Sequence, residues 1–201
     1  MIRLYGSTYS RAARCLWMLE ELGEPYEHQD LADLDATAAL QTVSQVNPIG
    51  KVPALEDGEL KLFESMAINL YLAARYSSML WPSGVGDQGR ATAWSIWGMT
   101  EMEPPLAQLF LERVIRKEGQ RDLQNEARAL DSLTRPLDAL EKYLDGMDYL
   151  LGEKFTVADL NLASVLTLMN RANFDLQAYP NTNRWRRACY DRPAYRKIYP
   201  G

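Results

Sequence analysis

The stretch from Asn47 to Ala74 constrains the fold more than any other part of this chain. It reads N-P-I-G-K-V-P-A-L-E-D-G-E-L-K-L-F-E-S-M-A-I-N-L-Y-L-A-A. An X-Pro step at Val52-Pro53 begins a short apolar run, and an Asp-Gly pair separates that run from a second one. Glu64-Ser65 then opens a segment whose apolar residues recur at helical spacing. This order predicts a strand, a tight turn, a second strand and a helix.

The same features suggest a binding site. A proline that starts a strand cannot complete a sheet ladder, so Val52 can offer its backbone N–H and C=O to an extended peptide if the Val52-Pro53 bond is cis. The helix start at Ser65 favours a carboxylate, and Glu64 attracts an ammonium group. An amine and a carboxylate on one carbon, followed by an extended peptide, describe a γ-linked glutamyl peptide. In the structural alternative, Pro53 only starts a strand, and Glu64-Ser65 only opens a helix.

The pattern N-P-x-G-K-V-P-x-L, then D-G, then L-F-E-S-x-A-I resembles the glutathione-binding half of the glutathione S-transferase family. The resemblance extends over most of the chain. It implies an α/β thioredoxin-like N-terminal domain, an all-α C-terminal helical domain and a homodimer. It also implies glutathione as co-substrate, bound by residues of this stretch: Lys51, Val52, Pro53, Glu64 and Ser65. Lys51 matches a family position that contacts the glycyl end of glutathione.

Hydrophobic periodicity predicts strands and helices in the order β-α-β-α-β-β-α up to about residue 76, with the first helix at 10–22 and the second strand at 26–31. A turn-rich segment without periodicity follows. We therefore predict a first domain at 1–77, a linker at 78–87 and a helical domain at 88–201. Within the helical domain, Thr156 and Asp159 have the spacing of a capping box.

Composition narrows the possible partners. The chain has 201 residues, of which 47% are hydrophobic, which is enough for a substantial core. Its net charge of −5 argues against nucleic acid as the main partner. Cys15, Cys189 and the single histidine, His28, form neither a disulfide framework nor a metal-ligand pattern. No apolar run reaches membrane-spanning length and no signal core follows the first residue, so we expect a cytoplasmic protein.

The chemistry that the resemblance implies is activation of a thiol. Lowering a thiol pKa by two units requires about 2.7 kcal/mol, which one hydroxyl bond to the sulfur and a helix start can supply together. Ser10, in the run L-Y-G-x-x-x-S, resembles the serine of serine-type transferases that donates to the thiolate, and we predict that it is catalytic. Tyr5 is the second candidate. In the structural alternative, Ser10 only caps a helix.

More than one function is compatible with these residues. Conjugation of the glutathione thiolate to small hydrophobic electrophiles is the leading prediction. Glutathione-dependent peroxide reduction or isomerisation would use the same thiolate. A non-catalytic binding or scaffold protein is a further alternative, favoured by the absence of basic residues from 34–45, where several classes of the family place a histidine or lysine. The presence of Lys51 and Ser65 favours an enzyme.

Overall fold

The computed structural model describes residues 1–32 and 34–200. The chain divides into two compact units. Unit 1 comprises Met1–Ser83 and Asp191–Gly201, and unit 2 comprises Gly84–Tyr190. The end of the chain therefore belongs with its beginning, whereas the sequence suggested a helical domain that runs to the last residue.

Unit 1 is built on a sheet whose described strands have the order β2-β1-β3-β4. β1 and β2 are parallel, and the other neighbouring pairs are antiparallel. The predicted Asp-Gly turn joins β3 to β4, with Gly58 at φ 61°. The second strand is shorter than predicted because it ends where its partner β1 ends, at the Tyr5–Gln29 pair. The strands are β1 Ile2–Tyr5, β2 Tyr26–Gln29, β3 Ala54–Asp57 and β4 Leu60–Phe63.

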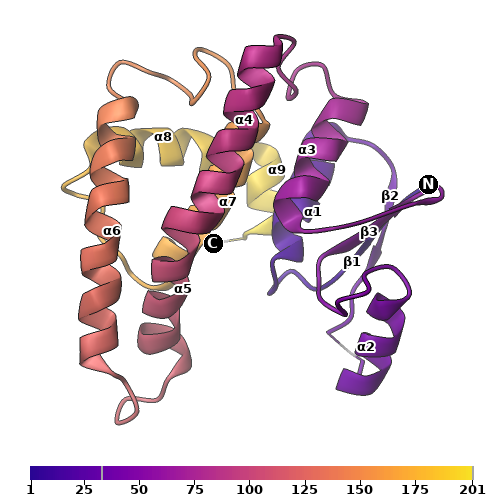
Figure 1. Ribbon diagram of the computed structural model, residues 1–201, viewed down its shortest axis with the longest axis horizontal. Helices are drawn as coiled ribbons and strands as arrows, with labels where there is room; N and C mark the ends of the chain where they lie inside the picture. Colours follow the sequence, from indigo (N-terminus) through magenta and orange to yellow (C-terminus); the bar gives the residue numbers. More distant parts are fainter. Residues whose placement is uncertain (33, 201) are drawn as a thin grey trace. The chain divides into compact units, whose positions relative to one another are not determined.

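Helices cover both faces of this sheet (Figure 1). The side chains of Tyr5 and Ala54 pack with Val43 of α2 on one face. Leu4 and Leu55 are paired across β1 and β3, and both are fully buried. Because side chains alternate along a strand, these leucines face the opposite layer, where α1 packs against α3. The helices are α1 Ala12–Leu22, α2 Ala36–Ser44 and α3 Ser65–Tyr76. This confirms the predicted thioredoxin-like arrangement.

The C-terminal helix α9, Pro193–Ile198, packs against α1. The rings of Trp17 and Tyr195 meet edge to face at 5.0 Å. Arg192 donates from Nε and Nη2 to the two carboxylate oxygens of Glu21, at 2.7 and 2.6 Å. The guanidinium of Arg192 is thus paired with Glu21 and is not simply a solvated charge.

Unit 2 is helical, as predicted. Its first helical run spans α4 Val85–Trp97, a π-turn at Gly98–Met102, α5 Glu103–Phe110 and a second π-turn at Leu111–Ile115. Pro104 and Pro105 stand in the first turn of α5, directly after the π-turn. The remaining helices of unit 2 are α6 Leu123–Tyr143, α7 Val157–Arg171 and α8 Pro180–Tyr190.

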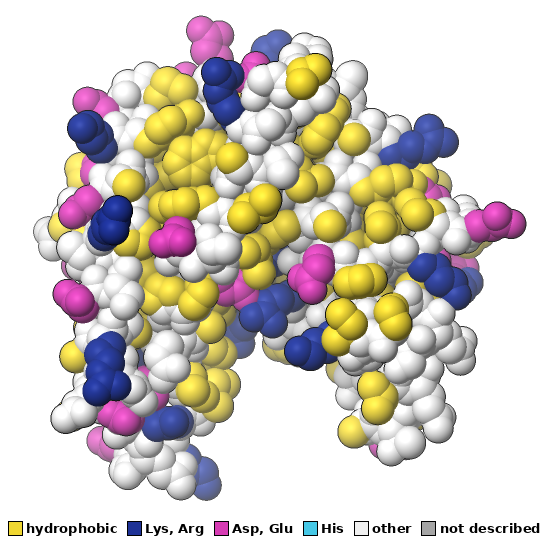
Figure 2. Space-filling model, in the orientation of Figure 1, with side chains coloured by type: hydrophobic (Ala, Val, Ile, Leu, Met, Phe, Trp, Pro, Cys, Tyr) yellow, Lys and Arg dark blue, Asp and Glu magenta, His cyan; other side chains and the backbone are white. Residues whose placement is uncertain are grey.

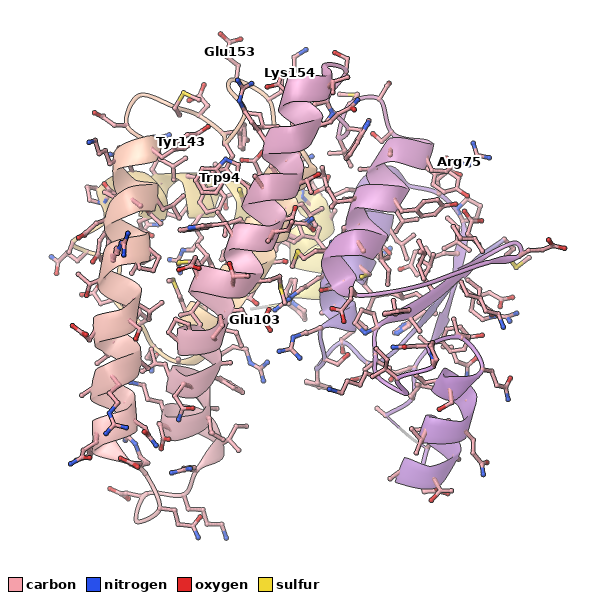
Figure 3. All side chains as sticks on the ribbon, viewed as in Figure 1. Arg75, Trp94, Glu103, Tyr143, Glu153 and Lys154 are labelled. Atoms are coloured by element: carbon pink, nitrogen blue, oxygen red, sulfur yellow. The ribbon has the colours of Figure 1, made fainter. Side chains whose placement is uncertain are left out.

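Aromatic side chains gather between α4 and the end of α6. The ring of Trp94 meets Tyr143 at 4.7 Å and Trp97 at 5.2 Å, both edge to face. Figure 3 shows Trp94 and Tyr143 side by side on these two helices. Hydrophobic side chains are visible at the surface in this part of unit 2 (Figure 2), and Tyr143 is 38% exposed. The aromatic residues of α4 therefore lie only partly within the core of unit 2.

The predicted capping box at Thr156 and Asp159 is present, and it is larger than predicted. Asp159 is fully buried, and its second carboxylate oxygen also accepts hydrogen bonds from the backbone N–H of Leu150 at 2.7 Å and from Trp185 Nε1 at 2.9 Å. Burial raises the pKa of Asp159 although these hydrogen bonds oppose the shift. This one carboxylate therefore links the start of α7 to α8 and to the loop that precedes α7.

Glu141 on α6 caps α8 from outside that helix. Its two carboxylate oxygens accept the backbone N–H groups of Asn181 and Thr182, both at 2.8 Å. Burial raises the pKa of Glu141, but these N–H bonds outweigh it, so the pKa lies below its ordinary value. The carboxylate satisfies donors that a helix start leaves unpaired.

We predict that Glu141→Gln lowers the free energy of unfolding by about 1–2 kcal/mol at neutral pH, because a charged acceptor is lost. A lowered native pKa stabilises the fold above the ordinary carboxyl value of about 4.3, and this contribution is lost as pH falls below it. The difference between the wild type and Glu141→Gln should therefore shrink in acid. Urea unfolding at two pH values checks this, with the exposed Glu153→Gln as the control. A pH-independent difference would contradict the charge argument.

Glu64 holds an uncommon backbone conformation just before α3, with φ 69° and ψ 114°. An L-residue with a long side chain rarely adopts positive φ, and such a position costs about 1–3 kcal/mol. This conformation turns the chain sharply from β4 into the first turn of α3. Backbone strain of this kind is concentrated at binding sites.

Replacing Glu64 by glycine should relieve this strain and raise the free energy of unfolding by about 1 kcal/mol. The matched control is Glu59→Gly, since Glu59 is an exposed turn residue without positive φ, where glycine should lower stability by about 0.5–1 kcal/mol. Thermal unfolding of both variants gives the comparison. Loss of stability in both would show that Glu64 is not strained.

Candidate functional site

The start of α3 has the properties expected of an anion site. Ser65 is its first residue, and no side chain of the described chain caps it. The side chain of Glu64 is exposed, whereas Ser65 is only 2% exposed and its Oγ lies 3.5 Å from Nη1 of Arg14. The backbone N–H groups of this first turn and the helix dipole favour a carboxylate here.

The Val52-Pro53 peptide bond is cis, as the site hypothesis required. Pro53 is buried and directly precedes β3, while Val52 is half-buried. Within residues 1–32 and 34–200, the backbone of Val52 makes no hydrogen bond. Its N–H and C=O are therefore available to an extended ligand that adds a short strand.

The loop before Val52 is ordered by Asn47, whose importance the sequence did not reveal. Asn47 is 3% exposed, donates from Nδ2 to the carbonyl of Lys51 at 2.6 Å and accepts the N–H of Ile49 at 3.0 Å. The Lys51 side chain is exposed and forms no ion pair in the described part of the chain. A cation is thus presented next to Val52 by a rigid loop.

Ser10 lies two residues before α1, because the helix begins at Ala12 and not at residue 10 as predicted. Its hydroxyl donates to the carbonyl of Ser7 at 2.8 Å and accepts the N–H of Ala12 at 3.1 Å. The structural alternative, in which this hydroxyl binds the helix start, is therefore seen in the structure. To donate to a ligand, the hydroxyl must turn away from Ser7 while still accepting from Ala12.

Gly6 brings the Ser10 loop and Val52 together. It has φ 125°, and a Cβ placed on it would lie 2.8 Å from Cβ of Ala12 and 2.9 Å from Cβ of Val52. Only glycine combines this backbone conformation with so close an approach. The structure thus places the start of α1 beside the cis peptide, and Arg14 further along α1 beside the start of α3.

Tyr5 is not arranged to activate a thiol. Its hydroxyl donates to Oε2 of Glu56 at 2.6 Å, and its ring packs in the cluster on the α2 face of the sheet. Burial and the bond to Glu56 raise its pKa. Tyr5 is 7% exposed, so its hydroxyl is engaged away from the layer that contains α1 and α3.

Cys15 is fully buried, and burial raises its pKa, which makes it a poor nucleophile. Cys15 is thus a small residue of the core. Among residues 1–32 and 34–200, no group of histidine, cysteine, aspartate or glutamate side chains could hold a metal ion. No helix in the same range is long and apolar enough to cross a membrane.

Comparison with known proteins identifies the family. Residues 1–74 match the family model described as glutathione S-transferase, N-terminal domain, and residues 102–193 match the C-terminal domain model. Glutathione S-transferase 1 of Zea mays is 31% identical, with 98% of this chain and 95% of the relative covered.

Solved structures agree with this assignment. A theta class glutathione S-transferase of Xanthomonas axonopodis pv. citri with glutathione bound has a TM-score of 0.90 and 28% identity, covering 100% of this chain and 97% of that chain. A structure of glutathione S-transferase-I bound with lactoylglutathione has a TM-score of 0.87 and 29% identity, covering 98% and 97%. With both family models matched across the two units, this chain belongs to the glutathione S-transferase family.

Proposed function

We propose that this protein binds glutathione in unit 1 and transfers its thiolate to small hydrophobic electrophiles. The observation that carries the proposal is the combination, within unit 1, of an uncapped α3 start, an unpaired Val52 backbone and a serine hydroxyl at the start of α1. The relatives crystallised with glutathione or lactoylglutathione support the choice of ligand.

Each end of the peptide has a proposed partner. The glutamyl carboxylate binds the start of α3 at Ser65, and the glutamyl ammonium pairs with the exposed Glu64. Val52, set by the cis bond to Pro53, pairs with the peptide backbone. Lys51 faces the glycyl carboxylate, and no basic residue of α2 assists it, since 34–45 contains none.

Ser10 is the proposed catalytic residue. Its hydroxyl turns from the carbonyl of Ser7 to the glutathione sulfur and donates to the thiolate. A hydrogen bond to a charged group stabilises it by about 1.5–3 kcal/mol, which lowers the thiol pKa by roughly one to two units. The occupied hydroxyl of Tyr5 supports Ser10 over Tyr5 in this role.

The resemblance also leads us to propose a cytoplasmic homodimer. Peroxide reduction and isomerisation would use the same activated thiolate and are the nearest alternatives. A non-catalytic protein of this fold is favoured only by the absence of a basic residue from α2. Retention on immobilised glutathione, together with conjugation assays using activated aryl chlorides and epoxides, tests the proposal. Binding without turnover would favour the non-catalytic alternative, and the absence of both would overturn the proposed function.

We predict that Ser10→Ala lowers kcat/KM for conjugation at neutral pH by about 10- to 100-fold, because the thiol pKa rises by one to two units. The ultraviolet absorbance of bound thiolate, titrated with pH, measures that shift directly. Ser10→Thr keeps a hydroxyl and should retain most activity, and Thr8→Ala removes an exposed hydroxyl of the same loop as the control. Unchanged activity in Ser10→Ala would mean that another group activates the thiol.

A further inference from the structure

The backbone of Gly6 is bonded to β2 on both of its sides. Its N–H donates to the carbonyl of Gln29 at 3.1 Å, and its carbonyl oxygen lies 2.7 Å from Nε2 of His28. A carbonyl oxygen only accepts, so the imidazole donates from Nε2 and carries a hydrogen there. Within residues 1–32 and 34–200, the Gly6 carbonyl accepts no other hydrogen bond. The His28 side chain therefore sets the direction of this carbonyl group.

Strand register brings His28 to this place. His28 is paired with Leu4 across β2 and β1, so both side chains leave the sheet on the face that carries α1 and α3. β2 is the edge strand next to β1, and His28 is exposed. The imidazole fills no part of the core, so replacing it creates no cavity. An effect of its replacement on the reaction can thus be separated from a loss of stability.

Gly6 needs such support because glycine has more backbone freedom than any other residue. Its close contacts with Ala12 and Val52 exclude a side chain at residue 6, but they do not orient its peptide group. The hydrogen bonds from β2 supply that orientation. Loss of the bond from His28 would leave the peptide between Gly6 and Ser7 held only from the side of the Gly6 N–H.

The orientation of this peptide is passed on to Ser10. The carbonyl of Ser7 accepts both the backbone N–H of Ser10 at 3.1 Å and its hydroxyl at 2.8 Å. Rotation of the peptide between Gly6 and Ser7 would move this carbonyl and, with it, the Ser10 hydroxyl. Displacement of a reacting or donor group by even about 1 Å can slow a reaction many-fold. His28 is thus connected to Ser10 through consecutive hydrogen bonds of one short turn.

We propose that His28 is a positioning residue for activation of the thiol. By donating to the Gly6 carbonyl, it fixes the turn that presents the Ser10 hydroxyl to the sulfur of glutathione, without itself touching the ligand. The inference rests on the proposed function, since it assumes that Ser10 donates to a bound thiolate. It gives the edge strand β2 a part in the reaction, although β2 contributes no residue to the candidate site.

His28→Gln and His28→Met form a matched pair of variants. Both new side chains are unbranched and similar in length, but only glutamine has a donor that can replace the imidazole Nε2–H. We expect His28→Met to lower kcat/KM for conjugation about 3- to 10-fold and to raise the pKa of the bound glutathione thiol by about 0.5–1 unit. His28→Gln should keep most of the wild-type activity. The pKa is measured from thiolate absorbance titrated with pH.

Two further measurements distinguish positioning from a merely structural role. The Kd of S-methylglutathione, which has no thiol, should change less than about twofold in either variant, because binding outside the thiol is untouched. In the Ser10→Ala background, His28→Met should lower kcat/KM by less than about twofold, because the hydroxyl that His28 positions is absent. A structural role would give the same loss with and without that hydroxyl.

The outcomes are separable. If the wild type neither binds nor turns over glutathione, the proposed function fails and this inference fails with it. If the wild type binds without turnover, the thiol pKa alone decides. Equal behaviour of His28→Met and His28→Gln, or an equal loss in the Ser10→Ala background, overturns the inference and leaves the proposed function standing. Should His28→Met fail to fold, His28→Asn decides, since its donor is too short to reach the Gly6 carbonyl. The same loss is expected in His28→Asn, and wild-type activity there would overturn the inference.

Discussion

The close backbone contact at Gly6 is the constraint on which the candidate site depends. The end of β1, the start of α1 and the residue before the cis proline all meet there, and none could approach if residue 6 carried a side chain. The contact sets the distance between the Ser10 loop and the free backbone edge of Val52. The proposed binding surface for an extended peptide thus depends on the absence of a side chain at Gly6 as much as on the polar groups around it.

Ser10 and Ser65 illustrate how a hydroxyl is given direction by its neighbours. The Ser10 oxygen accepts a hydrogen bond from the N–H of Ala12, so the start of α1 fixes its position. The same hydroxyl donates a hydrogen bond to the carbonyl of Ser7. The Ser65 oxygen lies 3.5 Å from Nη1 of Arg14, which donates to it. In both cases a donor on α1 occupies the oxygen. The first helix therefore organises two hydroxyl groups that belong to different helices or loops.

The features that could be predicted from the sequence are local ones. The Asp-Gly turn, the helix that opens at Ser65 and the capping box at Asp159 each depend on residues within a few positions of one another. The family pattern supplied the two-part architecture and the candidate residues around Val52. Hydrophobic periodicity and turn residues were sufficient to predict the turn, the helix start and the capping box, because the hydrogen bonds of each feature join residues within one helical turn or one hairpin.

The features that could not be predicted depend on distant partners. Glu141 caps α8 across forty residues, and Arg192 pairs with Glu21 from the other end of the chain. No local pattern marks these side chains, since a glutamate on a helix is ordinarily solvated. α1 starts at Ala12 and not at residue 10, and this difference also depends on residues that are distant in the sequence. Residues 10 and 11 are good helix openers, but the chain must first turn through the Gly6 contact.

The packing of α9 on α1 has a consequence for synthesis on the ribosome. The N-terminal sheet and its helices emerge first, yet the ring that packs on Trp17 and the guanidinium that pairs with Glu21 belong to a segment translated more than 100 residues later. Before that segment is made, Trp17 lacks the ring of Tyr195, and Glu21 lacks its ion pair with Arg192. The packing of α1 is therefore complete only when the segment from Asp191 onward is present.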